Sequence, residues 1–478
     1  MKPLLIILFS LYNYSVHSQT YFNKSYDVFS GFADGFVPIV LDSNKFYVGG
    51  SGQTGIYRKN VILVTDLNGD TIESIKFGRD SALYNTGYKL LKDETGFVFV
   101  GSETYQGLQV PFAARLNNLY DTLWTSKRWS QSEGVFNSVI KKNHRFILAG
   151  SKETGLSGNN YIDGFVQCVD SSGNILWQQT YDSSLGEVFY SIDTTIDGGF
   201  ILAGYQNSPT SSLNIYVVKI DSLGIVSSGW PKVFSSSNSE AGWVKTLSDG
   251  NYILYGSWDS GSINESAHIR KLDQNGNTLW FQNFQGPLAS QIFNFFTDAL
   301  ELNNGDLVFI GNLFDPQINN PAGWIIKTNS LGIEKWRRTL KLRSNDHYPY
   351  GIVLTPDNGF AISGALLADG GGTTQDGWII KLDSLGCAVS GCTLSVEEED
   401  FISDVIVYPN PSRGKFYLES NNFQNSFYEI HDLNGRLITQ SIINSSKTEI
   451  ELLNHQGVFI LSYQNSNGIY RKKIIITE

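Results

Sequence analysis

Six acidic residues, each followed by an aromatic residue, are the positions in this sequence whose types and spacing could do chemistry. The acids are Asp34, Asp80, Glu133, Glu187, Glu240 and Asp346, and the aromatic residues two to four positions later are Phe36, Tyr84, Phe136, Phe189, Trp243 and Tyr348. At the one gap in the series Gln291 takes the place of the acid. Carboxylates gathered at one place attract cations and basic ligands, because their fields add. The alternative is that each acid bonds a neighbouring backbone and each aromatic residue packs, because a repeated position usually serves the repeat.

Other catalytic patterns are missing from the sequence. It has no His-Glu-x-x-His motif, no phosphate-binding Gly-Lys loop and no Gly-x-Ser-x-Gly elbow. Five histidines follow the N-terminal segment, and none pairs with another at the spacing of metal ligands: His144, His268, His347, His431 and His455. We therefore predict no catalytic set, no metal and no cofactor. The net charge of −11, with no block of Lys or Arg, argues against nucleic acid as a partner.

These acids belong to a repeat that runs through most of the chain. Each copy has an apolar run that ends in glycine, and the seven glycines are Gly50, Gly101, Gly150, Gly204, Gly256, Gly311 and Gly364. Successive spacings are 51, 49, 54, 52, 55 and 53 residues. A fixed period of this length indicates one supersecondary unit repeated as a solenoid, propeller or array.

Each copy predicts four antiparallel strands. In the copy that spans 187–234, an alternating segment precedes the turn Asp197–Gly199, and the apolar run Phe200–Tyr205 follows it. A variable loop, a third strand, the tight turn Asp221–Gly224 and a fourth strand that carries Trp230 complete the unit. Four strands in each of seven units are typical of a seven-bladed β-propeller. The competing interpretation is an open solenoid.

The two ends of the array favour the propeller. The last unit stops at Gly386 after three strands, whereas Tyr21–Tyr26 is an unassigned strand with the pattern of a fourth strand. We expect this strand to complete the last blade, which would leave only short, protected sheet edges. The predicted propeller spans 19–387.

The repeat resembles the SBBP-type bacterial β-propeller repeats over roughly residues 20–387. The resemblance rests on a strand, an Asp-x-x-Gly turn and a Trp-bearing strand, as in Asp170–Trp177. The motif is also similar to the quinoprotein tryptophan motif. That motif has a longer Asp-to-Gly spacing, which argues against a quinone cofactor.

The N-terminus predicts a signal peptide over 1–18. Lys2 precedes the apolar segment Leu4–Leu11, and small or apolar residues at Val16 and Ser18 suit cleavage before Gln19. The segment is shorter than the roughly 20 apolar residues that span a bilayer. We expect no transmembrane segment.

In an exported protein, the close pair Cys387 and Cys392 predicts a disulfide. A metal site is the alternative for this pair, but no third and fourth ligand lie nearby. Cys168 lies in an apolar strand and is expected to be a buried thiol.

After an acidic linker over 388–403, residues 404–478 contain short alternating strands that predict a small Ig-like β-sandwich. This stretch resembles the type A C-terminal sorting domain of type IX secretion in Bacteroidetes. The residues that carry the resemblance are Tyr408, Pro409, Asn410, Pro411, Gly414, Asp432, Gly435, Arg436, Gly457, Lys472 and Lys473. The resemblance implies that the type IX machinery is a partner. It also implies passage through the periplasm, and then release or attachment at the outer-membrane surface.

Our hypothesis from the sequence is a secreted or surface-displayed, non-catalytic propeller that binds a glycan or a surface protein. The alternatives are a polysaccharide-acting glycoside hydrolase or lyase on the same scaffold, and a structural adhesin component. Recognition is expected on the face with the long, variable loops, because variable loops on a rigid scaffold carry function. The candidate ligand-binding residues there are Glu133, Glu187, Glu240, Asp346, Tyr105 and Trp258.

Overall fold

The computed structural model divides into two compact units, Met1–Cys392 and Thr393–Glu478. The residues that it describes are 20–29, 34–54, 56–80, 82–126, 132–153, 162–208, 213–235, 242–259, 265–285, 294–315, 320–343, 345–367, 375–389, 405–420, 423, 426–432, 436–443, 445–465 and 468–477. These residues form strands and turns, with no helix among them. Accordingly, no helix in the described part of the chain could cross a membrane.

The first unit contains seven four-stranded antiparallel sheets, or blades, within its described residues. Blade 1 has β2 (Asp34–Asp42), β3 (Lys45–Thr54), β4 (Tyr57–Thr65) and β5 (Thr71–Phe77); blade 2 has β6 (Tyr84–Asp93), β7 (Gly96–Tyr105), β8 (Leu108–Asn117) and β9 (Thr122–Thr125); blade 3 has β10 (Gly134–Lys142), β11 (Arg145–Glu153), β12 (Ile162–Val169) and β13 (Ile175–Tyr181); blade 4 has β14 (Glu187–Thr194), β15 (Phe200–Asn207), β16 (Leu213–Ile220) and β17 (Lys232–Phe234). Blade 5 has β18 (Gly242–Thr246), β19 (Tyr252–Asp259), β20 (Glu265–Leu272) and β21 (Thr278–Phe284); blade 6 has β22 (Phe295–Glu301), β23 (Leu307–Asp315), β24 (Asn320–Thr328) and β25 (Glu334–Leu340); blade 7 has β26 (His347–Leu354), β27 (Phe360–Leu367) and β28 (Gln375–Leu382), with β1 (Phe22–Tyr26) as its fourth strand.

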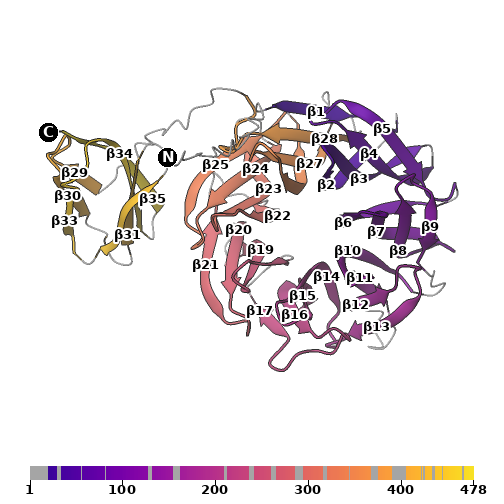
Figure 1. Ribbon diagram of the computed structural model, residues 1–478. Helices are drawn as coiled ribbons and strands as arrows, with labels where there is room; N and C mark the ends of the chain where they lie inside the picture. Colours follow the sequence, from indigo (N-terminus) through magenta and orange to yellow (C-terminus); the bar gives the residue numbers. More distant parts are fainter. Residues whose placement is uncertain are drawn as a thin grey trace, which may run out of the picture. The chain divides into compact units, whose positions relative to one another are not determined.

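The blades surround a common centre, with strands such as β6, β14 and β22 innermost and β5, β9, β13 and β21 outermost (Figure 1). The second and third strands are almost wholly buried, because neighbouring blades cover both of their faces. This burial explains why the second strands read as continuous apolar runs rather than as alternating ones.

The N-terminal strand β1 belongs to the last blade. It pairs antiparallel with β28, from Phe22 opposite Lys381 to Tyr26 opposite Gly377. On the inner side, β2 of blade 1 contacts β26, β27 and β28 of blade 7. The strand therefore occupies the position that the sequence predicts for it.

The repeated glycines exist because the first strand of most blades bulges. In blade 4 the register of β14 against β15 shifts between Phe189 and Ser191, which leaves Tyr190 outside the ladder. The bulge presses a carbonyl onto the facing glycine, so that a Cβ at Gly204 would lie 1.8 Å from the backbone oxygen of Val188. No side chain fits there, and a bulge of this kind redirects the residue that it expels.

The Asp-x-x-Gly turns join neighbouring blades. In the turn of blade 6, Gly332 has a φ of +76°. The indole ring of Trp280, from β21 of blade 5, lies directly against this glycine. The same relation recurs around the propeller, and in blade 1 the ring of Phe22 covers Gly69. Phe22 thus covers the turn glycine of blade 1 as a tryptophan covers that of each of blades 3 to 7.

The second unit is a two-sheet structure. One sheet has the order β29 (Val405–Tyr408), β30 (Lys415–Ser420) and β33 (Lys447–Glu451). The other has the order β32 (Leu437–Ile443), β31 (Ser426–Asp432), β34 (Gly457–Asn465) and β35 (Gly468–Ile476). A single apolar core, which includes Phe416, Ile430 and Leu461, lies between them. This is the arrangement of a small β-sandwich.

Candidate functional site

The bulges place one side chain from each of several blades at the ring centre. Polar residues at this position bind the next blade: Asn137 donates to the carbonyl of Phe189 at 2.8 Å, and the Thr297 hydroxyl donates to that of Pro349 at 2.8 Å. In blades 2, 4 and 7 the expelled residue is instead a tyrosine. These tyrosines are Tyr88, Tyr190 and Tyr350.

The tyrosines meet other aromatic residues in what we call the central aromatic cluster: Tyr88, Tyr190, Tyr205, Trp243 and Tyr350. The ring of Tyr88 lies edge-on to Tyr190 and to Trp243, with centroids 5.5 and 5.7 Å apart. Tyr190 stacks on Trp243 at 5.2 Å and tilts against Tyr205 at 5.7 Å. Blade 2 is adjacent to neither blade 4 nor blade 5, so these contacts span the ring centre.

Several polar atoms of the cluster have no hydrogen-bond partner among the described residues. Among the described residues the hydroxyls of Tyr88, Tyr205 and Tyr350 have no hydrogen-bond partner. The indole N–H of Trp243 is buried and likewise lacks one. Burial raises the pKa of Tyr88 and Tyr205, and burial together with Tyr88 raises the pKa of Tyr350 to about 12. The phenols therefore stay protonated at neutral pH and can donate hydrogen bonds.

Two aspartates beside the cluster connect adjacent blades. Asp193 of β14 accepts the backbone N–H of Thr246 at 2.9 Å, and Asp298 of β22 accepts that of Ile352 at 3.1 Å. The second oxygen of each carboxylate accepts the amide of the following residue, at 2.7 and 2.8 Å. Lys245 forms an ion pair with Asp298 at 3.2 Å. Both carboxylates are thus occupied by structural contacts rather than poised as an acid–base pair.

Of the predicted acids, Glu187 is fully buried, and protein side chains form hydrogen bonds with its carboxylate. Its carboxylate accepts hydrogen bonds from the Ser183 hydroxyl and, at 3.2 Å, from the Gln206 amide. Burial raises its pKa. Carboxylate oxygens of Asp163, Asp182 and Glu187 lie within 4.8 Å of one another. Three carboxylates fall short of the six to eight oxygens that calcium takes, and the contacts of Glu187 fit the packing alternative.

The other predicted acids that the structure describes make contacts near the start of the first strands. Glu133 is exposed, and its carbonyl accepts the N–H of Glu153 at 2.7 Å. Asp346 accepts the hydroxyl of Tyr348 at 2.7 Å, and its carbonyl accepts the N–H of Leu367 at 3.0 Å. Position 240 lies outside the described residues. The described acids therefore cap the ladder between the first and second strands.

Two aromatic residues predicted on long loops belong to strands instead. Tyr105 ends β7, and only Gln106 and Gly107 connect it to β8. Both connecting residues have positive φ, 52° and 87°, as in the two-residue hairpin turns that match strand twist. The guanidinium of Arg79 lies over the Tyr105 ring, 5.5 Å from its centroid. Trp258 lies within β19.

Of the six aromatic residues paired with acids, Trp243 alone belongs to the central cluster. Phe36, Phe136 and Phe189 are fully buried in cores between blades. The tyrosines of the cluster were missed by the sequence reasoning. The sequence feature that could have identified them is a second aromatic residue directly after the repeated one, as Tyr190 follows Phe189. Two successive residues of a regular strand point to opposite faces, so only a register shift could direct Tyr190 to the centre.

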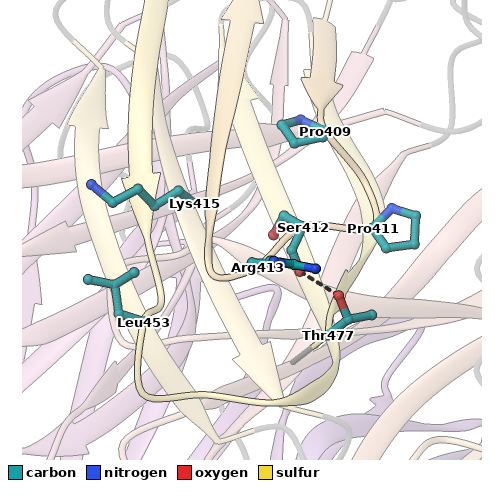
Figure 2. Close-up of a pocket in the computed structure, with 7 residues that line it drawn as sticks. All are labelled: Pro409, Pro411, Ser412, Arg413, Lys415, Leu453 and Thr477. Atoms are coloured by element: carbon teal, nitrogen blue, oxygen red, sulfur yellow. Dashed lines mark hydrogen bonds between the residues drawn. The ribbon is translucent and has the colours of Figure 1, made fainter.

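The second unit has a hollow of its own, of about 470 Å³. Figure 2 shows Pro409, Pro411, Arg413 and Lys415 around it, with Ser412 bonded to Thr477 near the end of the chain. The Asn410 side chain donates to the carbonyl of Lys473 at 2.6 Å and accepts the N–H of Ile475 at 2.8 Å. The Tyr-Pro-Asn-Pro segment and the final strand thus form one surface. Gly435 lies outside the described residues.

The cysteines agree with an exported protein. Cys387 is disulfide-bonded and Cys168 is a buried free thiol. Position 392 lies outside the described residues, so the pairing of Cys387 with Cys392 stays a prediction. The predicted signal peptide over 1–18 also lies outside them.

Comparison with known proteins identifies the tail. Residues 406–477 match the secretion system C-terminal sorting domain. No curated protein sequence matches the chain. An ulvan lyase of polysaccharide lyase family 25 is structurally similar, with a TM-score of 0.49, 12% identity, and coverage of 77% of this chain and 97% of that one. The β-propeller domain of the Trilobed protease from Pyrococcus furiosus has a TM-score of 0.41, 11% identity, and coverage of 75% and 99%. A thermostable family-43 glycoside hydrolase has a TM-score of 0.31, 13% identity, and coverage of 51% and 88%.

The seven four-stranded sheets make this an all-β, propeller-type chain, and the family match gives it a sorting tail. Such a tail implies export, to the cell surface or into the medium, and interaction with the type IX secretion machinery. Similarity at this level says nothing about which ligand the chain binds or whether it acts on it.

Proposed function

We propose that this chain is an exported, non-catalytic β-propeller that binds a glycan at the central aromatic cluster. After transit through the periplasm, the sorting domain directs it to the cell surface or into the medium. The observation that carries the proposal is a cluster of rings spanning the ring centre with phenol and indole donors unused by the protein.

The chemistry of a sugar fits this cluster. A pyranose has apolar C–H faces that pack on aromatic rings and a rim of hydroxyls that need hydrogen-bond partners. Tyr190 and Trp243 offer stacked rings, and Tyr88, Tyr205 and Tyr350 offer hydroxyls. Tyr88, Tyr190 and Tyr350 lie midway along the first strands of their blades.

The carboxylates beside the cluster support binding without hydrolysis. Most glycoside hydrolases use a pair of carboxyl groups that are free to act on the scissile bond. The two aspartates beside the cluster hold backbone amides of adjacent blades instead. A hydrolase or lyase and a surface adhesin remain the alternatives that the experiment separates.

A glycan array probed with the secreted protein tests the proposal, followed by a reducing-sugar release assay on each glycan that binds. Tyr88→Ala and Tyr350→Ala should each weaken binding at least tenfold with an unchanged urea midpoint. Tyr57→Ala, at an exposed tyrosine at the start of β4, is the matched control and should bind normally. Equal affinity of all variants would refute the site, and release of reducing ends would refute the non-catalytic role.

A further inference from the structure

A lysine stands at the ring centre without a partner. Lys89 follows Tyr88 in the bulge of β6, where the register shifts between Thr86 and Leu90. Its side chain is accessible to solvent although protein surrounds it. It makes no hydrogen bond or ion pair with any described residue.

The other charged groups that Lys89 faces are Lys245, Asp193 and Asp298, from blades 5, 4 and 6. The carboxylates accept backbone amides on both oxygens, and Asp298 also pairs with Lys245. Of these four charged residues, Lys89 is therefore the one that forms no hydrogen bond or ion pair with a described residue. Burial, followed by the charge of Lys245, lowers the pKa of Lys89 despite the two aspartates.

We propose that Lys89 binds an acidic substituent of the ligand, so that the glycan recognised at the ring centre carries carboxylate or sulfate groups. This rests on the proposed function, because it is the sugar ring on the aromatic cluster that brings the substituent to the lysine. Tyr88 and Lys89 leave the ladder in the same bulge, and one ligand can therefore contact both.

An anion at this position would relieve an electrostatic cost already present in the free protein. The ammonium group lies among protein atoms near a second lysine, and both lower its pKa. A charge-assisted hydrogen bond in such surroundings is stronger than one in open water. Removing it is expected to weaken binding about 10- to 100-fold.

Matched pairs of ligands test the inference. One pair is oligogalacturonate and its full methyl ester, and the other is a sulfated dextran oligosaccharide and the unsulfated one. The native protein should bind the charged member of one pair at least tenfold more tightly, and the pair that responds identifies carboxylate or sulfate. Lys89→Met should abolish this preference and Lys89→Arg should retain it. Lys232→Met, in the outer strand β17, is the matched control.

The outcomes distinguish this inference from the proposed function. Equal binding of charged and neutral members, or a preference that survives Lys89→Met, overturns the inference and leaves glycan binding intact. If no glycan binds, the proposed function fails, and the lysine is tested with inorganic sulfate and acetate. Either anion should then slow acylation of Lys89 by an amine reagent, measured by peptide mass mapping. No protection by either anion would overturn the inference.

Discussion

Replacing Gly204 by alanine should distort the bulge of blade 4 and lower the stability of the propeller. The new Cβ would lie 1.8 Å from the backbone oxygen of Val188 and 2.9 Å from the Cα of Phe189, where ordinary contact begins at 3.4 Å. Both obstacles are backbone, so β14 must move away from β15 by roughly 1.6 Å. Two lost ladder hydrogen bonds cost about 2 kcal/mol, and loosened packing of Phe189 adds about as much. The free energy of unfolding should fall by about 4 kcal/mol.

Urea unfolding followed by tryptophan fluorescence measures this loss. Gly107→Ala is the control, because Gly107 has no atom within 4 Å of the new Cβ, so that its positive φ of 87° is the one penalty that alanine meets there. It should cost only the left-handed backbone penalty of about 1–2 kcal/mol. Gly204→Ala should also weaken glycan binding, since the bulge aims Tyr190. If Gly204→Ala costs no more than Gly107→Ala, the bulge does not explain the repeated glycine.

Three further outcomes are expected. Deleting 19–27 removes β1 and should lower the melting temperature or cause aggregation, because β28 becomes an open edge; an unchanged melting temperature would show that this pairing contributes nothing. Burial, with Arg270 nearby, lowers the pKa of His268 to about 3. The contribution of the neutral imidazole to the free energy of unfolding is therefore fully present above pH 6.5, and it falls by about 1.4 kcal/mol per pH unit as the pH decreases. His268→Gln should reduce the difference between the urea midpoints at pH 7 and pH 5, and an equal difference would contradict this. Removing 404–478 should leave the protein inside the cell, as measured by fractionation, and normal surface or medium levels would contradict the role of the tail.

Much of the fold could be predicted because it repeats. The glycine that faces each bulge and the glycine of each Asp-x-x-Gly turn answer local steric demands, and such demands leave the same residue in most copies. Gly204 and Gly332 are examples. The strand order and the place of β1 follow from these signals, whereas the two-sheet tail was predicted from its own short alternating strands. The lengths of the hairpins did not, because the turn at Gln106 and Gly107 resembles a variable loop in sequence.

The candidate site could not be predicted in the same way. The prediction followed the repeated acids, and the structure gives Glu187 and Asp346 contacts within or between neighbouring strands. A residue conserved by repetition meets a need that every blade shares. A ligand at the ring centre does not need the same residue in every blade, because each blade would contact a different part of it.

Residues that serve a ligand should therefore differ among blades at a position whose backbone is the same. The bulge supplies that position. It carries Asn137 and Thr297 where it joins two blades, and Tyr88, Tyr190 and Tyr350 where it faces the centre. The common backbone fixes where the side chain goes, and the choice of side chain decides whether it bonds the scaffold or remains available to a ligand. Under the proposed function, departures from the repeat at the bulge mark the ligand-binding residues, and the binding assays on Tyr88→Ala and Tyr350→Ala test this.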